Sequence, residues 1–217
     1  AGLPEILASG LASGRLRFVV GAPEAAADAE VVFLCVQTPQ GPDGAADLSY
    51  VEQVAREIAP VLAADAVVVN KSTVPVGTTR LVERVLSEAG AAHDGVAVAS
   101  NPEFLREGQA IHDFLNPHRI VIGCDRPEAA GRLTELYAGL RAPVLVTDPA
   151  SSEMIKYAAN AFLATKVSFI NAIANLCEAV DADVREVALG MGYDARIGFQ
   201  FLNAGPGYGG SCFPKDV

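Results

Sequence analysis

Residues 66–75 read AVVVNKSTVP, an apolar run that changes abruptly into polar residues and a proline. Similar short runs rich in Val, Ile or Phe occur at residues 17–20, 31–36, 96–99, 119–122 and 143–146. Stretches with helical spacing lie between several of them, as at residues 50–62 and 78–89. Continuous apolar strands that alternate with helices indicate a parallel sheet covered on both faces. The sequence therefore predicts an α/β fold.

Length and charge limit the classes of protein that fit. A chain of 217 residues with 51% hydrophobic residues can bury a substantial core and suggests one or two domains. The net charge of −10 disfavours nucleic acid as a partner. Small anionic ligands remain compatible with it, because they respond to local fields and not to the total charge.

The four cysteines, Cys35, Cys124, Cys177 and Cys212, show no CxxC or Cys/His spacing, so no metal site is predicted. Two of them lie in apolar strand-like or helix-like runs, which suits reduced thiols in the cytoplasm better than disulfides. We find no apolar run of transmembrane length and no signal peptide. We therefore expect a cytoplasmic protein with no membrane partner.

Polar residues follow three of the predicted strands directly. The runs at 31–36, 66–70 and 96–99 lead into Gln37-Thr38-Pro39, Lys71-Ser72-Thr73 and Ser100-Asn101-Pro102-Glu103. Ligands of open parallel sheets bind outside the carboxyl ends of the strands. Strand termination alone accounts for any one of these loops, but three at one edge favour a binding site.

Asn101-Pro102 is typical of the cap and first residue of a helix, which would place Glu103 and Glu107 on one helix face. A carboxylate in the first turn also complements the helix dipole, so Glu103 has a sufficient structural role there without catalysis.

A second cap, Asp148-Pro149, opens the longest predicted helix, Pro149–Val180. Its broad apolar surface must be buried by other elements or by a partner subunit. Lys156 and Asn160 are four residues apart and share one face of it. An exposed lysine is the default interpretation, although tightly packing alanines follow Lys156 directly.

Near the C-terminus, residues 207–216 read GYGGSCFPKD and place Cys212 in a glycine-rich loop with Lys215 and Asp216. Glycines let backbone N–H groups approach an anion, and a nearby cation favours the nucleophilic thiolate. The alternative is a turn that holds one small buried hydrophobe.

These motifs together resemble the UDP-glucose/GDP-mannose dehydrogenases, and most closely those that act on UDP-glucose. The resemblance covers essentially all 217 residues. It is carried by Thr38-Pro39, by KSTVPVG at 71–77, NPEFLREG at 101–108, KYAANAF at 156–162, RIG at 196–198, Phe201-Leu202 and the loop at 207–216.

Members of this family begin with a strand and a GxGxxG turn and end with a second nucleotide-binding domain. Neither occurs in this sequence, so we expect this chain to be a fragment. The resemblance does not imply that the fragment is active by itself. The resemblance implies a partial NAD-binding Rossmann domain at residues 1–148, with a sheet incomplete at its N-terminus. It further implies a helical central dimerisation and substrate domain at residues 149–217.

The implied reaction is a four-electron oxidation of a sugar C6 alcohol to a carboxylate with two NAD⁺, in which Cys212 forms a thiohemiacetal and then a thioester. The implied catalytic residues are Cys212, Lys156, Asn160, Asp216, Glu103 and Thr73. The implied cofactor contacts are Thr38, Ser72, Glu107 and Lys215. The implied substrate contacts are Phe104, Leu105, Arg196, Phe201, Leu202, Gly207, Tyr208 and Gly209.

Two alternatives stay open. A two-electron hydroxyacid-type dehydrogenase would share the sheet, the long helix and the Lys–Asn pair but would not need Cys212. A truncated dimerisation module would bind no NAD and catalyse nothing. Within the family, Phe213-Pro214-Lys215 favours UDP-glucose over other nucleotide-sugars, and we expect a homodimer or a higher homo-oligomer.

Overall fold

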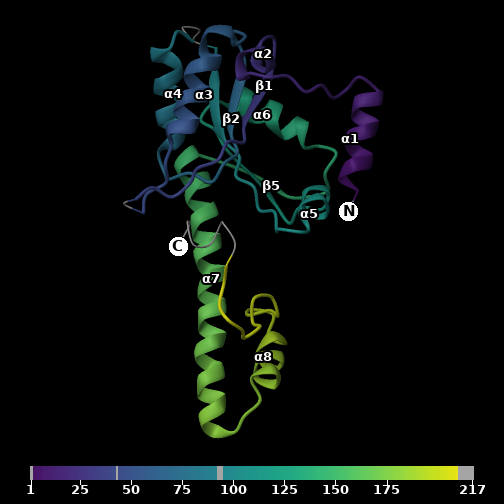
Figure 1. Ribbon diagram of the computed structural model, residues 1–217, viewed down its shortest axis with the longest axis vertical. Helices are drawn as coiled ribbons and strands as arrows, with labels where there is room; N and C mark the ends of the chain where they lie inside the picture. The colour runs from purple at the N-terminus through teal and green to yellow at the C-terminus, as the bar shows by residue number, and fades with distance from the viewer. Residues whose placement is uncertain (1, 43, 92–94, 210–217) are drawn as a thin grey trace. The chain divides into compact units, whose positions relative to one another are not determined.

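The computed structural model describes residues 2–42, 44–91 and 95–209. The chain forms two compact units, Ala1–Lys156 and Tyr157–Val217, and the boundary between them falls inside the long helix α7 (Pro149–Val180). The first unit contains the sheet and the helices that cover it (Figure 1).

The sheet has five strands in the order in which they occur along the chain. They are β1 (Val31–Leu34), β2 (Val67–Asn70), β3 (Ala97–Ser100), β4 (Ile120–Gly123) and β5 (Val144–Thr147). The first three strands are parallel, which confirms the α/β, Rossmann-like prediction. Strand β4 runs antiparallel to β3, and β5 is parallel to β4, so the sheet is mixed and not wholly parallel.

Helices cover both faces of the sheet, as the continuous apolar strands predict. Val68 and Val98 face a core shared with α3 (Ser49–Ile58) and α4 (Thr78–Glu88). Val67 and Ala97, one residue along, face the opposite core under α6 (Pro127–Leu136). Figure 1 shows α3 and α4 side by side. The remaining helices of this unit are α1 (Leu3–Ala12), α2 (Ala22–Ala26), η1 (Ala59–Val61) and α5 (Ala110–Leu115).

The prediction of a strand at residues 17–20 is wrong. This segment belongs to no helix or strand, Phe18 is exposed, and Val20 is 97% exposed. A strand needs a hydrogen-bonded neighbour, and the described residues supply none beside it. The β propensity of these residues was therefore not sufficient to predict a strand.

The prediction of a helix that starts at Asn101-Pro102 is also wrong, because no helix begins until α5 at Ala110. The side-chain amide of Asn101 does not cap a helix: its Nδ2 donates to the Val121 carbonyl at 2.8 Å. Glu103 and Glu107 consequently do not share a helix face.

In the first turn of α7, the backbone N–H of Ser151 donates to Asp148 Oδ1 at 2.9 Å, which confirms the predicted cap. The helix ends at Val180. Asp181 then adopts a positive φ of 59°, and the N–H of Ala182 donates to the Cys177 carbonyl at 2.9 Å. This is a Schellman ending built on aspartate instead of glycine. In the second unit, α7 is followed by α8 (Val184–Gly192).

Among the described helices, α7 alone has the length and composition that crossing a membrane would require. This differs from the sequence interpretation, which found no run of that length. Long apolar core helices of soluble proteins meet the same criteria, so the finding is weak evidence for a membrane span.

The core under α6 provides a test of the packing. Leu133→Ala should lower the free energy of unfolding by about 2–5 kcal/mol, because Leu133 is fully buried and its truncation leaves a cavity. Leu136→Ala, on the same helix but 55% exposed, should change it by about 0.5 kcal/mol or less. Urea unfolding of both variants gives the comparison, and equal losses would contradict the assigned core.

Candidate active site

Hydroxyl groups link the first two strands at their carboxyl ends. Ser72 Oγ, after β2, donates to the carbonyl of Val36, after β1, at 2.5 Å. Thr38 Oγ1 donates to the carbonyl of Thr73 at 2.9 Å. The polar residues that follow these strands therefore gather at one edge, as the sequence predicts. The same edge in other α/β proteins is where ligands bind.

The third strand joins this edge through Lys71 and Asn101. Lys71 Nζ donates to the Asn101 carbonyl at 3.2 Å and to its Oδ1 at 3.1 Å. Burial lowers the pKa of Lys71, whereas the charges of Cys35 and Glu103 raise it and that of Lys156 lowers it further. Several ionisable groups at the ends of the strands are thus electrostatically coupled.

Lys156 and Glu103 form a largely buried ion pair. Lys156 Nζ lies 3.3 Å from Glu103 Oε1, and their side chains are 6% and 28% exposed. Glu103 Oε2 also accepts the N–H of Leu105 at 2.5 Å. The default interpretation of Lys156 as an exposed lysine is therefore wrong. A lysine is seldom buried to this degree unless it is paired or functional.

Two cations lie close to the aromatic ring of Phe104. Lys156 Nζ is 5.3 Å from its ring centroid, and the guanidinium carbon of Arg119 is 3.8 Å from it. Burial lowers the pKa of Arg119. Phe104 lies in the loop after β3, and Arg119 directly precedes β4, the strand that pairs with β3. The sequence analysis did not identify Arg119, since no local pattern marks it.

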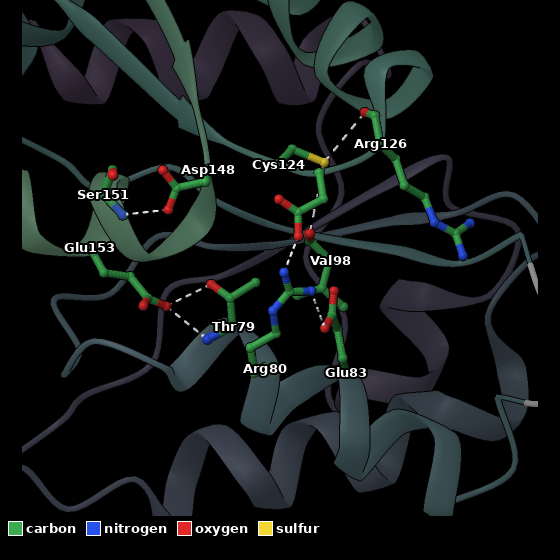
Figure 2. Close-up of polar contacts among 10 residues, drawn as sticks. Thr79, Arg80, Glu83, Val98, Cys124, Arg126, Asp148, Ser151 and Glu153 are labelled. Carbon is green, nitrogen blue, oxygen red and sulfur yellow. Dashed lines mark hydrogen bonds and ion pairs between the residues drawn. The ribbon is translucent and has the colours of Figure 1, made fainter.

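The first turn of α7 is held by Glu153, which is 2% exposed. Its carboxylate accepts the N–H of Gly77 at 2.6 Å and both the N–H and hydroxyl of Thr79 at 2.7 and 2.6 Å. Figure 2 shows Glu153 facing Thr79. The carboxylate thereby caps α4 from another helix. It lies one turn before Lys156, so it fixes that lysine relative to the loop carrying Ser72 and Thr73.

The start of α7 also lies very close to the backbone of β4 at Gly123. Ser152 Oγ donates to Ser100 Oγ at 3.0 Å. A Cβ atom on Gly123 would lie 2.4 Å from the Ser152 side chain and 2.8 Å from Pro149. Only glycine at this position allows the start of α7 to lie against β4.

Two described cysteines lie near the sheet. Cys35 is solvent-exposed, although partial desolvation raises the pKa of its thiol and the charge of Lys71 lowers it. Cys124 is buried, and burial raises its pKa. The Cys124 thiol lies 3.8 Å from the Val98 carbonyl and 3.5 Å from that of Arg126 (Figure 2). The buried environment of Cys124 therefore disfavours its thiolate.

The other predicted site residues are distributed over both units and the residues beyond the described part of the chain. Glu107 and Leu105 are exposed in the loop before α5. In the second unit, Asn160 is buried and Arg196 is exposed; Arg196 donates to the Asp194 carboxylate, which raises its pKa. Cys212, Lys215 and Asp216 lie outside the described residues. The remaining predicted substrate contacts of the second unit are the buried Leu202, the half-buried Phe201, and the exposed Gly207, Tyr208 and Gly209.

The described residues contain no cluster of His, Cys, Asp or Glu that could hold a metal ion. The hydroxyl groups of Thr38 and Ser72 instead lie, each donating to a backbone carbonyl, at the edge where parallel-sheet proteins hold dinucleotides. This donor set fits the polar nicotinamide end of NAD, the cofactor that the sequence implies.

Comparison with known proteins assigns the class. Residues 1–141 match the NAD binding domain of the UDP-glucose/GDP-mannose dehydrogenase family, and residues 150–217 match its central domain. The chain belongs to this family.

Individual relatives show which members of the family this chain is similar to. The chain is 56% identical to a UDP-glucose 6-dehydrogenase of Rhizobium meliloti and 52% identical to UDP-glucose 6-dehydrogenase YwqF of Bacillus subtilis. All of this chain is aligned in both, against 51% and 49% of the relatives. The solved UDP-glucose dehydrogenase of Pyrobaculum islandicum is 47% identical with a TM-score of 0.94, over 99% of this chain and 50% of that one. The chain thus spans about half the length of these relatives.

The carboxylate of Glu153 can be tested directly. Glu153→Ala should lower the free energy of unfolding by about 3 kcal/mol or more, because charged hydrogen bonds are lost and buried N–H groups lose their acceptor. Glu57→Ala, which removes an exposed carboxylate that accepts only from Gln53 in the described structure, should cost far less. Denaturant unfolding measures both, and a neutral Glu153→Ala would refute the inter-helix cap.

Proposed function

We propose that the protein carrying this chain oxidises the C6 alcohol of UDP-glucose to a carboxylate in two NAD-dependent steps. The observation that supports this most is the buried Lys156–Glu103 pair, 3.3 Å apart, at the carboxyl edge of a sheet of the NAD-binding class. A buried ammonium beside a carboxylate offers both an oxyanion donor and a base. The names of the similar relatives favour UDP-glucose as the substrate.

The proposed chemistry needs a covalent intermediate because an aldehyde is a poor donor of a second hydride. When bound, NAD⁺ accepts one hydride from C6 in each of the two oxidations. Between them, the Cys212 thiolate adds to the aldehyde carbon, and a carbon–sulfur bond forms. Loss of the second hydride leaves a thioester. Attack by water then breaks the carbon–sulfur bond and returns the thiolate.

The other residues take the roles that this path requires. Lys156 and Asn160 donate to the oxygen on C6 as negative charge develops there. Glu103 takes a proton from the attacking water. Thr73 and Asp216 hold that water. Two oxidations, one covalent bond and one molecule of water thus balance the conversion of an alcohol into a carboxylate.

Binding contacts complete the proposal. Thr38, Ser72, Glu107 and Lys215 would surround the nicotinamide end of the cofactor. The backbone around Phe104 and Leu105 would contact the sugar, and Phe201, Leu202 and residues 207–209 would hold the nucleotide part. Arg196 would reach the substrate bound to a partner subunit.

The same proposal includes a homodimer built on α7. Within the second unit, Phe162, Phe169 and Leu176 follow one another at intervals of seven residues and are 64%, 46% and 61% exposed. That interval places them on one face of the helix. A stripe of large exposed apolar side chains is typical of an interface, and a second copy of the helix would cover it symmetrically.

Replacement of the proposed nucleophile tests the reaction. In the natural full-length protein, Cys212→Ser should reduce turnover to UDP-glucuronate by about a thousandfold or more, since a serine hydroxyl barely ionises at neutral pH. Slow single-hydride oxidation should survive. Cys124→Ser, whose hydroxyl can occupy the place of a buried thiol, should retain turnover. NADH yield per UDP-glucose is the readout: two in the wild type supports the proposal, whereas one indicates a two-electron dehydrogenase.

The dimer can be tested by placing a charge in the apolar stripe. Phe169→Glu should shift the protein from dimer to monomer, because an interface would have to bury an unpaired carboxylate. Phe114→Glu, at a similarly exposed phenylalanine of α5, should leave the assembly unchanged. Sedimentation velocity at micromolar concentration distinguishes the two, and a monomeric wild-type protein would refute the proposal.

A further inference from the structure

Asn101 occupies a position where three separate elements meet. It follows β3 directly, is 2% exposed, and its backbone N–H donates to the Asn70 carbonyl at 2.9 Å. Its side-chain Nδ2 donates to the Val121 carbonyl at 2.8 Å, and its Oδ1 accepts the Tyr137 hydroxyl at 2.5 Å. Lys71 Nζ reaches both Oδ1 and the backbone carbonyl. The amide has little freedom left to rotate or shift.

Tyr137 is a group that the proposed reaction does not use. It lies just after α6, is 7% exposed, and packs its ring in the core beneath the sheet. Burial raises its pKa to about 12, so its hydroxyl remains protonated and donates to Asn101 at neutral pH. Because the hydroxyl of this buried tyrosine donates to the residue at the end of β3, it supports that strand end specifically.

Lys71 supports the same point from the other side. Its ammonium lies 6.0 Å from the Tyr137 ring centroid and donates twice to Asn101. No carboxylate of the described residues forms an ion pair with it. The two oxygens of Asn101 are therefore its principal acceptors.

Glu103, the carboxylate of the pair that carries the proposed chemistry, lies two positions after Asn101, with Pro102 between them. Pro102 restricts the backbone dihedral angles between Asn101 and Glu103. The position of the Asn101 side chain therefore limits where the Glu103 carboxylate can lie. We propose that Tyr137 and Lys71 are positioning residues, which act through Asn101 to hold Glu103 beside Lys156. This inference rests on the proposed function, because it assigns them to the step in which Glu103 activates water.

Loss of either positioning residue should therefore impair the hydrolysis of the thioester and not the binding of the nucleotide-sugar. If Glu103 is displaced, attack of water on the thioester slows, while the residues proposed to hold the nucleotide part, Phe201, Leu202 and residues 207–209, belong to a different segment of the chain. The rate should be sensitive, since a shift of about 1 Å in a reacting group can cost up to about a hundredfold. The covalent enzyme should then accumulate during turnover.

The test uses the natural full-length protein with UDP-glucose and NAD⁺, well below its thermal midpoint. Tyr137→Phe removes one hydroxyl and keeps the ring. It should lower kcat about tenfold, leave KM within about twofold, and raise the fraction of enzyme carrying a covalent adduct at Cys212 by mass spectrometry of the acid-quenched enzyme. The matched control is Tyr50→Phe, at an exposed tyrosine of α3, which should behave as the wild type.

Lys71 gives an independent arm should Tyr137→Phe fold poorly. Lys71→Met should reproduce the loss of kcat and the accumulation of adduct, and Lys71→Arg should recover part of both because it restores a cation that can donate twice. A kcat within about twofold of the wild type in Tyr137→Phe and Lys71→Met would overturn the inference. So would a loss of activity without adduct.

A third variant distinguishes the proposed catalytic role of Glu103 from the positioning roles of Tyr137 and Lys71. Glu103→Gln should itself accumulate the adduct if Glu103 activates water. Accumulation in Glu103→Gln but not in the other variants refutes only the positioning role. Absence of adduct in Glu103→Gln refutes the proposed role of Glu103 and the inference with it.

Discussion

Burial of the Lys156 ammonium is the constraint on which the site depends. An ammonium that is 6% exposed needs a charged partner, because desolvation of an unpaired charge costs far more than a fold of this size can offset. Glu103 provides that partner from a loop that lies outside any helix or strand. The pair therefore requires two supports, one for the helix that carries the lysine and one for the loop that carries the carboxylate.

Each support is a polar group buried in an otherwise apolar layer. Glu153 caps α4 and fixes the first turn of α7, while Asn101 joins the ends of β2 and β3 to β4 and α6. Buried ion pairs and polar networks contribute little net stability compared with apolar residues of the same volume. Their presence at the edge of the sheet is better explained by the need to place reactive groups accurately, which is where perturbed ionisable groups gather in enzymes.

The sequence revealed the parts of this arrangement that are encoded locally. Valine-rich runs predicted β1 to β5, since a strand covered on both faces must be continuously apolar, and Asp148 predicted the start of α7. Residues 17–20 look like a strand by the same criterion, but pairing is not local. Asn101-Pro102 resembles a helix cap, but this local pattern is also misleading. The side-chain amide of Asn101 forms its hydrogen bonds with residues that lie 20 and 36 positions away in the sequence. No local pattern points to Tyr137 or Arg119 at all.

Charge is distributed in a way that suits anionic chemistry. The chain carries a net charge of −10, yet three cations lie near Glu103 or the adjacent Phe104. Lys156 pairs with Glu103, the charge of Glu103 also acts on Lys71, and Arg119 lies over the Phe104 ring. Surface carboxylates more than about 8 Å away are screened by salt, whereas partly buried charges are screened much less. The local field is therefore positive although the molecule is negative. A positive edge of this kind is what the proposed reaction requires, since it would stabilise both an anionic nucleotide-sugar and an oxyanion on its sugar.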